Sequence, residues 1–409
     1  METPRGGGTE VLSDLMGWTG SGPTMRGCAS GLRRGLLPAV LVAILFTPAG
    51  CTPTPPVVGP VWSRVTLPRG VKPVTLTAAG TRLLVGGRAA TARVKPRLLL
   101  VAPDGSGSEI PLTPHSAYAP EATWQSIASD GHRVLAVGGA VGGAHFNTRW
   151  TTWEGTNAGL TETPQPFDTF GGWGAGALIG PVLTSAGPAI AGSWAGARSG
   201  LDAAIWLPVG PRWVRAPSAG SALESTAALL VGQPSSATSA GAGIVMPGSA
   251  IHLGNGVVRQ FAAVWRSVRL NSGWSRVDLP DSGVTSAATS AQCTTQRCVV
   301  AGYVDHLLAL WRLSPSAAAR ISGVPGIASD ARSSIPPPLV IGARIIEVVS
   351  AKSRVVVLAG GDRPWKSIQG PVGEATSSAL AGGWLYVIAK HADGSSVLWR
   401  SRVKDLGVL

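Results

Sequence analysis

Short apolar runs, each bounded by glycine, proline or polar turn residues, follow one another from residue 61 to residue 409. Many of them alternate apolar and polar positions, which is the period of a strand with one buried face. Stretches such as 77–87 and 128–139 place two of these runs on either side of a small turn. We therefore predict an all-β domain of many short antiparallel strands.

One apolar run that ends in tryptophan recurs along the chain at intervals of 41 to 59 residues. Two degenerate copies end at Val101 and Leu358, and the other five end at Trp153, Trp206, Trp265, Trp311 and Trp399. A hairpin precedes each copy, and in the clearest cases a further strand follows it. Such periods in an all-β sequence indicate a β-propeller with four strands per blade. The repeat therefore predicts seven blades.

The fourth strand of the last unit is missing after Trp399, and a copy of it stands at the beginning of the domain. Residues 61–68, VWSRVTLP, repeat the phrase GWSRVDLP of residues 273–280. A ring of blades has to close, because an open edge leaves backbone donors and acceptors unpaired. We expect Val61–Leu67 to pair with the strand around Val397–Trp399. The predicted fold is a seven-bladed β-propeller closed by an N-terminal outer strand.

The chain contains 15 tryptophans, and nine of them occupy two repeated positions of the units. We interpret these nine as large rings that fill the space between blades that splay apart outward. A carbohydrate-stacking stripe is the alternative, and it requires exposed rings. The nine are Trp62, Trp153, Trp206, Trp213, Trp265, Trp274, Trp311, Trp365 and Trp399.

The first 60 residues have the pattern of an export signal and a tether. Residues 1–24 carry no structural signal and indicate a start at Met25. Residues 25–50 combine a basic segment, an apolar run at 36–46 and small residues, which is the pattern of a signal peptide. The apolar run is too short to span a bilayer as a helix. The ending Ala-Gly-Cys51 resembles a bacterial lipobox, although Pro48 stands where that motif has Leu, Val or Ile. This resemblance implies lipidation at Cys51, followed by a proline-rich tether at 51–60 and the propeller at 61–409. Cleavage and secretion without a lipid is the alternative, and both general and twin-arginine export remain open.

The two cysteines of the domain, Cys293 and Cys298, lie five residues apart. In an exported protein such a pair indicates a disulfide, here across the first hairpin of the fifth blade. A free pair or half of a metal site is the alternative, but no second Cys/His cluster completes such a site. We expect no metal and no cofactor.

The hairpin CTTQRCVVAG at 293–302 and the Trp-ended strands resemble the exported β-propellers found on many actinobacterial lipoproteins. The resemblance implies an envelope protein held by a lipid at the outer face of the cytoplasmic membrane. The kelch, WD40 and sialidase Asp-box patterns are not kept, so no enzymatic propeller family is supported. We predict a binding module, and an exported hydrolase or lyase is the alternative.

No set of catalytic residues stands out in the sequence. Asp130-Gly-His132 is an acidic–basic cluster, but it occupies the position of a hairpin turn in the other units. The Gly-x-Ser-x-Gly and phosphate-loop motifs are both absent. We therefore predict no catalytic residue.

The net charge of +13 suggests where a ligand would bind. Loops that join the second and third strands of the blades share one face of a propeller, and here they contain many arginines and lysines. Such a face concentrates anionic partners. The first candidates are Arg93, Lys95, Arg149, Arg198 and Arg259, and the second are His306, Lys352 and Arg354. We place the site near the central channel, under a lid formed by residues 233–259.

The expected partners are anionic envelope glycans, lipid headgroups or an envelope protein, bound by a monomer. Nucleic acid is not expected, because the protein is exported and its aromatic residues belong to the core. The alternative is that the basic side chains are independent and merely solvated.

Overall fold

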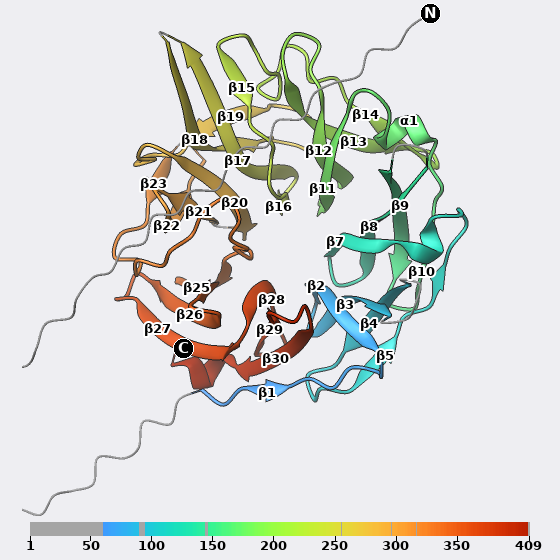
Figure 1. Ribbon diagram of the computed structural model, residues 1–409, viewed down its shortest axis with the longest axis vertical. Helices are drawn as coiled ribbons and strands as arrows, with labels where there is room; N and C mark the ends of the chain where they lie inside the picture. The colour runs from blue at the N-terminus through green and yellow to red at the C-terminus, as the bar shows by residue number, and fades with distance from the viewer. Residues whose placement is uncertain are drawn as a thin grey trace, which may run out of the picture. The chain divides into compact units, whose positions relative to one another are not determined.

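The computed structural model describes residues 60–89, 95–143, 146–254, 256–295, 297–315 and 317–407. Within these residues seven antiparallel sheets stand around a central axis (Figure 1), so the predicted seven-bladed propeller is confirmed. The expected start at Met25, the signal sequence at 25–50, the lipid site Cys51 and candidate Arg93 lie outside the described residues. No helix in the described part of the chain is long and apolar enough to cross a membrane.

The blades follow one another in chain order, each with its first strand innermost. Blades 1 and 2 consist of β2 (Val71–Ala79), β3 (Arg82–Ala89), β4 (Pro96–Val101) and β5 (Gly107–Glu109), and then β7 (Thr123–Ser129), β8 (Arg133–Gly142), β9 (Asn147–Thr156) and β10 (Gly159–Glu162). Blades 3 and 4 consist of β11 (Ala175–Thr184), β12 (Gly187–Ala195), β13 (Leu201–Val209) and β14 (Arg212–Arg215), and then β15 (Leu229–Val231) with β16 (Thr238–Ala240), β17 (Gly243–Gly254), β18 (Val257–Arg266) and β19 (Ser275–Asp278).

Blades 5 and 6 consist of β20 (Ser286–Cys293), β21 (Cys298–Val304), β22 (Leu307–Leu313) and β23 (Ala318–Arg320), and then β24 (Leu339–Ile341), β25 (Arg344–Ala351), β26 (Arg354–Gly361) and β27 (Lys366–Val372). Blade 7 consists of β28 (Glu374–Ala381), β29 (Trp384–Lys390), β30 (Ser396–Arg402) and β1 (Ser63–Arg64). The remaining elements are β6 (Leu112–Thr113), which pairs in parallel with β10, and the short helices η1 (Ala119–Glu121), α1 (Phe167–Phe170) and η2 (Val403–Leu406).

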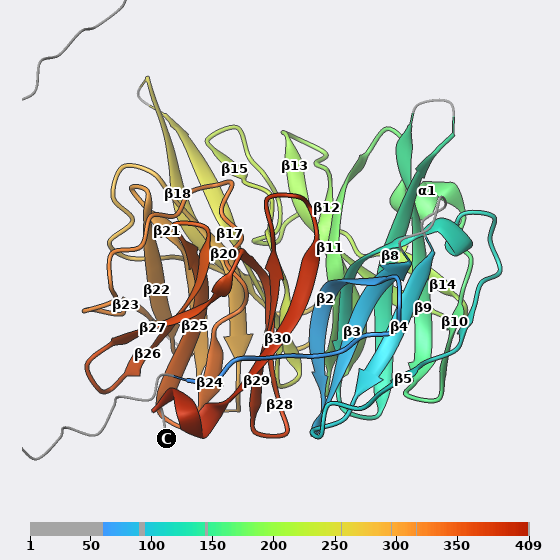
Figure 2. The same ribbon diagram turned by 60° about the horizontal axis from the view of Figure 1, so that its bottom comes forward.

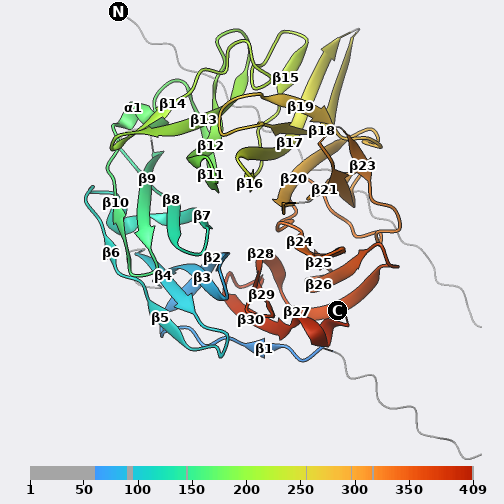
Figure 3. The same cartoon turned by 180° about the vertical axis from the view of Figure 1, so that it is seen from behind.

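The ring closes as the sequence predicts. Strand β1 pairs antiparallel with β30, with Ser63 opposite Arg400 and Arg64 opposite Trp399. The Val65 N–H then donates to the Leu398 carbonyl at 2.9 Å. Figures 1 and 3 show β1 along the outside of β30 from both sides. The N-terminal strand therefore supplies the fourth strand of the last blade.

The core is a series of apolar clusters between neighbouring blades. Trp153, Trp206, Trp265 and Trp311 are among the largest fully buried side chains of the described residues. Trp213 is buried as well, and the other four tryptophans of the repeat pack against the clusters while partly buried. The structural interpretation of these tryptophans is thus confirmed.

The lid expected at residues 233–259 is wrong. Residues 238–240, 243–254 and 257–266 form strands β16, β17 and β18, which are part of the sheet of blade 4. The serine, glycine and alanine residues that suggested a loop are small side chains that fit between packed blades. Residues 243–250 are all buried, and Ile244, Val245 and Met246 belong to the apolar clusters between blades.

The two faces of the ring are built from different connections. The upper face, uppermost in Figure 2, carries the loops between second and third strands and the connections between blades. The lower face carries the turns between first and second strands and the connections between third and fourth strands. The described residues of the upper loops are 95, 143, 146, 196–200, 256, 305–306, 352–353 and 391–395, and the interblade connections include 110–122, 163–174, 216–228, 279–285 and 321–338.

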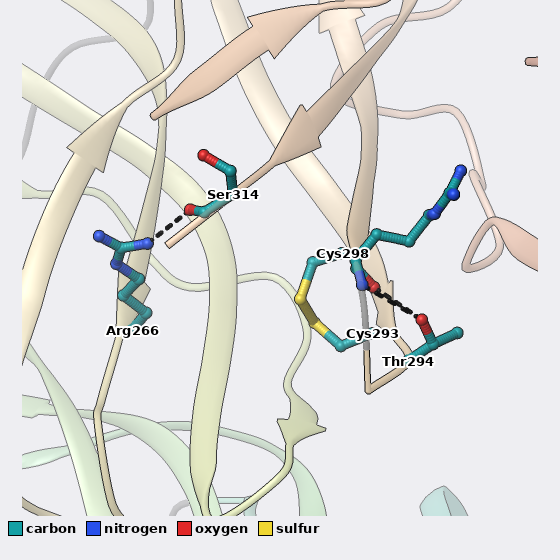
Figure 4. The surroundings of a disulfide bond; sticks show 6 residues. Arg266, Cys293, Thr294, Cys298 and Ser314 are labelled. Carbon is teal, nitrogen blue, oxygen red and sulfur yellow. Dashed lines mark hydrogen bonds between the residues drawn. A yellow bond between two sulfur atoms is a disulfide. The ribbon is translucent and has the colours of Figure 1, made fainter. Parts of the chain in front are cut away.

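The disulfide is present where the sequence predicts it. Cys293 and Cys298 are bonded at the lower ends of β20 and β21 (Figure 4), and they stand opposite each other in the pairing register. Beside the bond, Arg266 of blade 4 donates to the Ser314 carbonyl of blade 5 at 2.8 Å. Because disulfides persist in oxidising compartments, this bond indicates an exported environment.

Candidate functional site

Seven of the eight candidate residues lie at the upper face, and the eighth, Arg93, is outside the described residues. The seven are not gathered around the axis. Arg149, Arg259 and Lys352 each line a separate hollow. The structure therefore divides the predicted site into several smaller ones on different blades.

Most of the candidate arginines already have partners within the protein. Arg198 forms an ion pair with Glu224 at 3.2 Å. Arg259 donates to the Gly283 carbonyl at 3.2 Å, and Arg354 donates to the Gly370 carbonyl at 2.9 Å. No hydrogen bond or ion pair joins the side chains of Lys95, His306 or Lys352 to another described residue. These contacts leave Arg149 as the candidate with the most distinctive surroundings.

The upper face carries carboxylates beside the predicted cations. Besides the loops between second and third strands, the upper strand ends and the interblade connections share that face and bring carboxylates to it. These additional carboxylates are Glu109, Glu121, Glu162, Asp168, Glu224, Asp278, Asp281, Asp330 and Glu374. They offset the cations of the loops, so the excess of positive charge lies elsewhere on the ring.

The hollow at Arg149 lies between blades 2 and 3 and has a volume of about 130 Å³. The Arg149 guanidinium carbon stands 4.0 Å from the ring centre of Phe167 and 5.7 Å from that of Tyr118. Its Nε is buried and has no hydrogen-bond partner. Because Phe167 belongs to α1, which lies at the outer rim of the ring (Figure 1), the hollow is peripheral rather than axial.

Gly143 allows the guanidinium to occupy this place. Its φ of +75° is one that side chains other than glycine rarely adopt. A Cβ at this position would also stand 2.1 Å from the Arg149 Nη2. The turn at the upper end of β8 is therefore shaped around the arginine, and strand β9 supplies the arginine itself.

Glu162 lines the same hollow, but hydrogen bonds already occupy its oxygens. Its Oε2 accepts the backbone N–H groups of His115 and Ser116, both at 2.7 Å, and its Oε1 accepts the Ser116 hydroxyl at 2.6 Å. The side chain is buried. Glu162 thus holds the interblade segment in place.

Large apolar side chains are exposed on the upper face. Trp173 is fully exposed, with a fractional exposure of 107 %, and Phe146 and Val141 are exposed to 80 % and 69 %. Most of the exposed large hydrophobic residues of the described chain share this face, and they include Tyr118, Phe167, Leu201, Val257, Val258, Val284, Leu307 and Val372. Exposed apolar side chains that share one face are features of a binding surface.

The sequence did not predict the aromatic residues near Arg149. Tyr118, Phe167 and Trp173 come from two interblade connections, and neither repeats from blade to blade. The stretch FDTFGGWG at 167–174 was the one sequence feature that pointed to aromatic residues outside the repeat. It carries three aromatic residues that no repeat position accounts for.

The cluster Asp130-Gly-His132 is the turn that its position predicts. Asp130 Oδ1 accepts the backbone N–H of His132 at 2.9 Å and that of Arg133 at 2.7 Å. The bond from His132 lowers the pKa of the Asp130 carboxyl. Among the described residues no three His, Cys, Asp or Glu side chains gather as a metal site.

No protein-family model and no curated protein sequence matches the chain. Among solved structures, the β-propeller domain of the trilobed protease from Pyrococcus furiosus is 9 % identical, with a TM-score of 0.51 over 81 % of this chain and 96 % of that one. Trypanosoma rangeli sialidase is 11 % identical, with a TM-score of 0.46 over 86 % of this chain and 61 % of that one. The WD40 propeller of Doa1 is 10 % identical, with a TM-score of 0.48 over 85 % and 99 %. At such identities the first likeness shows the β-propeller fold alone, and the other two carry no argument.

Proposed function

We propose that the protein is an exported binding propeller that takes an acidic sugar of the cell envelope at the Arg149 hollow. The observation that carries the proposal is the Arg149 guanidinium, which lines the hollow, stands close to the rings of Tyr118 and Phe167 and has an unpaired Nε. A planar guanidinium binds a carboxylate or phosphate with two parallel hydrogen bonds. The hollow has a volume of about 130 Å³, which is enough for the acidic group of the ligand and the one sugar ring that carries it.

The surface around the hollow supports a sugar rather than a free anion. Phe146 and Trp173 present exposed ring faces on the same upper face. Such faces pack against the apolar side of a ligand while polar groups at the edge fix its orientation. Recognition is therefore expected to combine one charged contact with ring stacking.

The hollow supports binding rather than hydrolysis. General acid–base catalysis needs a carboxyl group that can exchange a proton with the substrate. Glu162 instead accepts three hydrogen bonds from the protein itself. The structure of the hollow thus favours a module that holds its ligand.

We also propose that Cys51 carries the lipid that attaches the protein to the outer face of the membrane. The disulfide supports export, and the sequence pattern at 25–51 supports the lipid. Labelling of growing cells with a fatty-acid analogue tests this proposal. Label on the natural chain and none on Cys51→Ser is the expected result, and equal label on both would contradict it.

A binding titration tests the role of Arg149. The Cys51→Ser chain is titrated with acidic oligosaccharides and with neutral oligosaccharides of the same length. Arg149→Gln removes the charge, and Arg149→Lys keeps the charge without the planar fork. The matched control is Arg133→Gln, because Arg133 lies on the same blade at the lower end of β8 and pairs with Glu154.

Arg149→Gln is expected to weaken binding of the acidic sugar by roughly 10- to 100-fold, the usual value of a hydrogen bond to a charged group. Arg149→Lys is expected to fall between the natural chain and Arg149→Gln, and Arg133→Gln is expected to bind normally. Phe146→Ser, at an exposed site, checks the stacking contact without a risk to the fold. Unchanged affinity in Arg149→Gln, or equal affinity for neutral sugars, would overturn the proposal.

A further inference from the structure

The excess positive charge of the ring lies at its lower face. Exposed cations from five of the blades lie there, and no hydrogen bond or ion pair joins their side chains to another described residue. They are Arg82, Arg212, Arg269, Arg363, Lys366, Arg402 and Lys404. The carboxylates of this face are fewer, and they are Asp104, Asp130, Glu154, Asp362 and Asp405. Two of these already pair with other arginines, Glu154 with Arg133 and Asp362 with Arg312.

The free cations are spread around the face instead of being gathered in a cleft. Arg82 belongs to blade 1, Arg212 to blade 3, Arg269 to blade 4, Lys366 to blade 6 and Lys404 to the end of blade 7. Of the exposed large hydrophobic residues only a few lie on this side, among them Val209 and Val268. An arrangement of this kind matches a broad anionic plane that the protein touches at many points without inserting into it.

One hollow in the lower face lies where blades 6, 7 and 1 meet, and its volume is about 440 Å³. Ile341 and Leu380 give it an apolar wall, and Arg402 and Lys404 supply cations. The Arg402 guanidinium carbon stands 4.5 Å from the ring centre of Trp384. This lining suits an anionic headgroup attached to an apolar chain.

The chain also reaches the ring on this side. The pairing of Ser63 with Arg400 and Arg64 with Trp399 directs the start of β1 toward Arg402, at the lower end of β30. Residues 52–60 separate Cys51 from Val61, and nine residues span at most about 30 Å. A lipid on Cys51 would therefore keep the membrane within reach of the lower face.

We propose that the lower face docks flat on the anionic phospholipid surface of the membrane. Charge complementarity and the side on which the tether arrives both support this occupant. The upper face, with the Arg149 hollow, then points away from the membrane toward its ligand. The inference goes beyond the proposed function and does not depend on it, because the two faces share no residue.

Vesicle co-sedimentation tests the docking. The Cys51→Ser chain excludes any contribution of the lipid, and the vesicles contain phosphatidylcholine alone or mixed with phosphatidylglycerol. The lower-face variant combines Arg82→Glu, Arg269→Glu and Lys366→Glu. The matched upper-face variant combines Arg69→Glu, Arg332→Glu and Lys390→Glu, which are also exposed and change the net charge equally. A third variant combines Phe146→Ser and Trp173→Ser.

The natural chain is expected to bind the mixed vesicles at low salt and to dissociate from them as the salt concentration rises. It is expected not to bind vesicles of phosphatidylcholine alone. The lower-face variant is expected to lose at least about tenfold in affinity, whereas the other two variants change by no more than about twofold. The glutamine versions of the three lower-face changes keep the test valid if the glutamate variant fails to fold.

Three results would overturn the proposal. Equal weakening by the two charge-reversal variants would show attraction by net charge alone. Loss of binding in the third variant would place the upper face in the membrane. Absence of binding to the mixed vesicles would refute docking, and binding of a soluble acidic polymer by the lower face in that case would identify its true partner.

Discussion

Glu347 on β25 is expected to make the propeller less stable as pH rises. Its side chain is completely buried, and neither carboxylate oxygen has a hydrogen-bond partner. Its cross-strand partner Leu358 belongs to the apolar cluster between blades 5 and 6. Burial raises the pKa of Glu347 well above 4.5, and the nearby Val348 N–H opposes this shift only in part.

The direction of the effect follows from proton linkage. Above pH 4.5 the unfolded chain releases the proton of Glu347, whereas the folded chain keeps it because the folded pKa is raised. The contribution of Glu347 to the free energy of unfolding is therefore completely present below this pH. It is lost progressively as pH rises toward the folded pKa. As long as the folded chain keeps the proton, the slope approaches at most about 1.4 kcal/mol per pH unit.

Urea unfolding of the natural chain and of Glu347→Gln, followed by tryptophan fluorescence from pH 5 to pH 8, measures this term. Other groups titrate equally in both proteins, so the difference between them isolates Glu347. The difference in favour of Glu347→Gln is expected to grow with pH. Glu374→Gln, which alters an exposed glutamate, is the control and should follow the natural chain. A difference between Glu347→Gln and the natural chain that stays constant from pH 5 to pH 8 would refute the reasoning.

Three further predictions concern the ring and the hollow. Replacement of Cys293 and Cys298 by serine is expected to lower the free energy of unfolding by about 2 kcal/mol, because the loop they close is short; no loss in urea titrations would contradict this. Val65→Ala, at the buried clasp of β1, is expected to cost about 2 kcal/mol and to speed proteolysis of the N-terminal strand; a protease-resistant strand would argue against its role in closure. Gly143→Ala is expected to displace Arg149 and to abolish binding of the acidic sugar, at a cost in stability of about 1–2 kcal/mol for the positive φ. Normal binding by Gly143→Ala would show that the sugar does not need Arg149 in its observed position.

The architecture could be predicted because the blades of a propeller repeat the same packing and strand-pairing positions. The tryptophan in the third strand of five blades fixes the blade length, and the displaced phrase at 61–68 identifies the closing strand. Both signals depend on a few residues per blade that have to pack or pair in the same way each time. The disulfide was predictable for a similar reason, since the register of a hairpin brings Cys293 opposite Cys298.

The surface could not be predicted in the same way, because its features come from segments that do not repeat. Glu121 and Asp281 bring negative charge to the upper face from connections that the blade pattern does not describe. Tyr118 and Phe167 reach Arg149 from two such connections. The segment 243–254 shows the opposite error, because small residues that allow close packing were taken for a loop.

Hydrogen–deuterium exchange with and without the acidic oligosaccharide tests the central claim most directly, namely that the ligand lies in the Arg149 hollow. Slower exchange on ligand addition is expected in residues 115–118, 146–150 and 166–174, which surround that hollow. The lower-face turns are expected to exchange at the same rate in both samples. Protection confined to the lower face, or to the hollows of Arg259 and Lys352, would contradict the account.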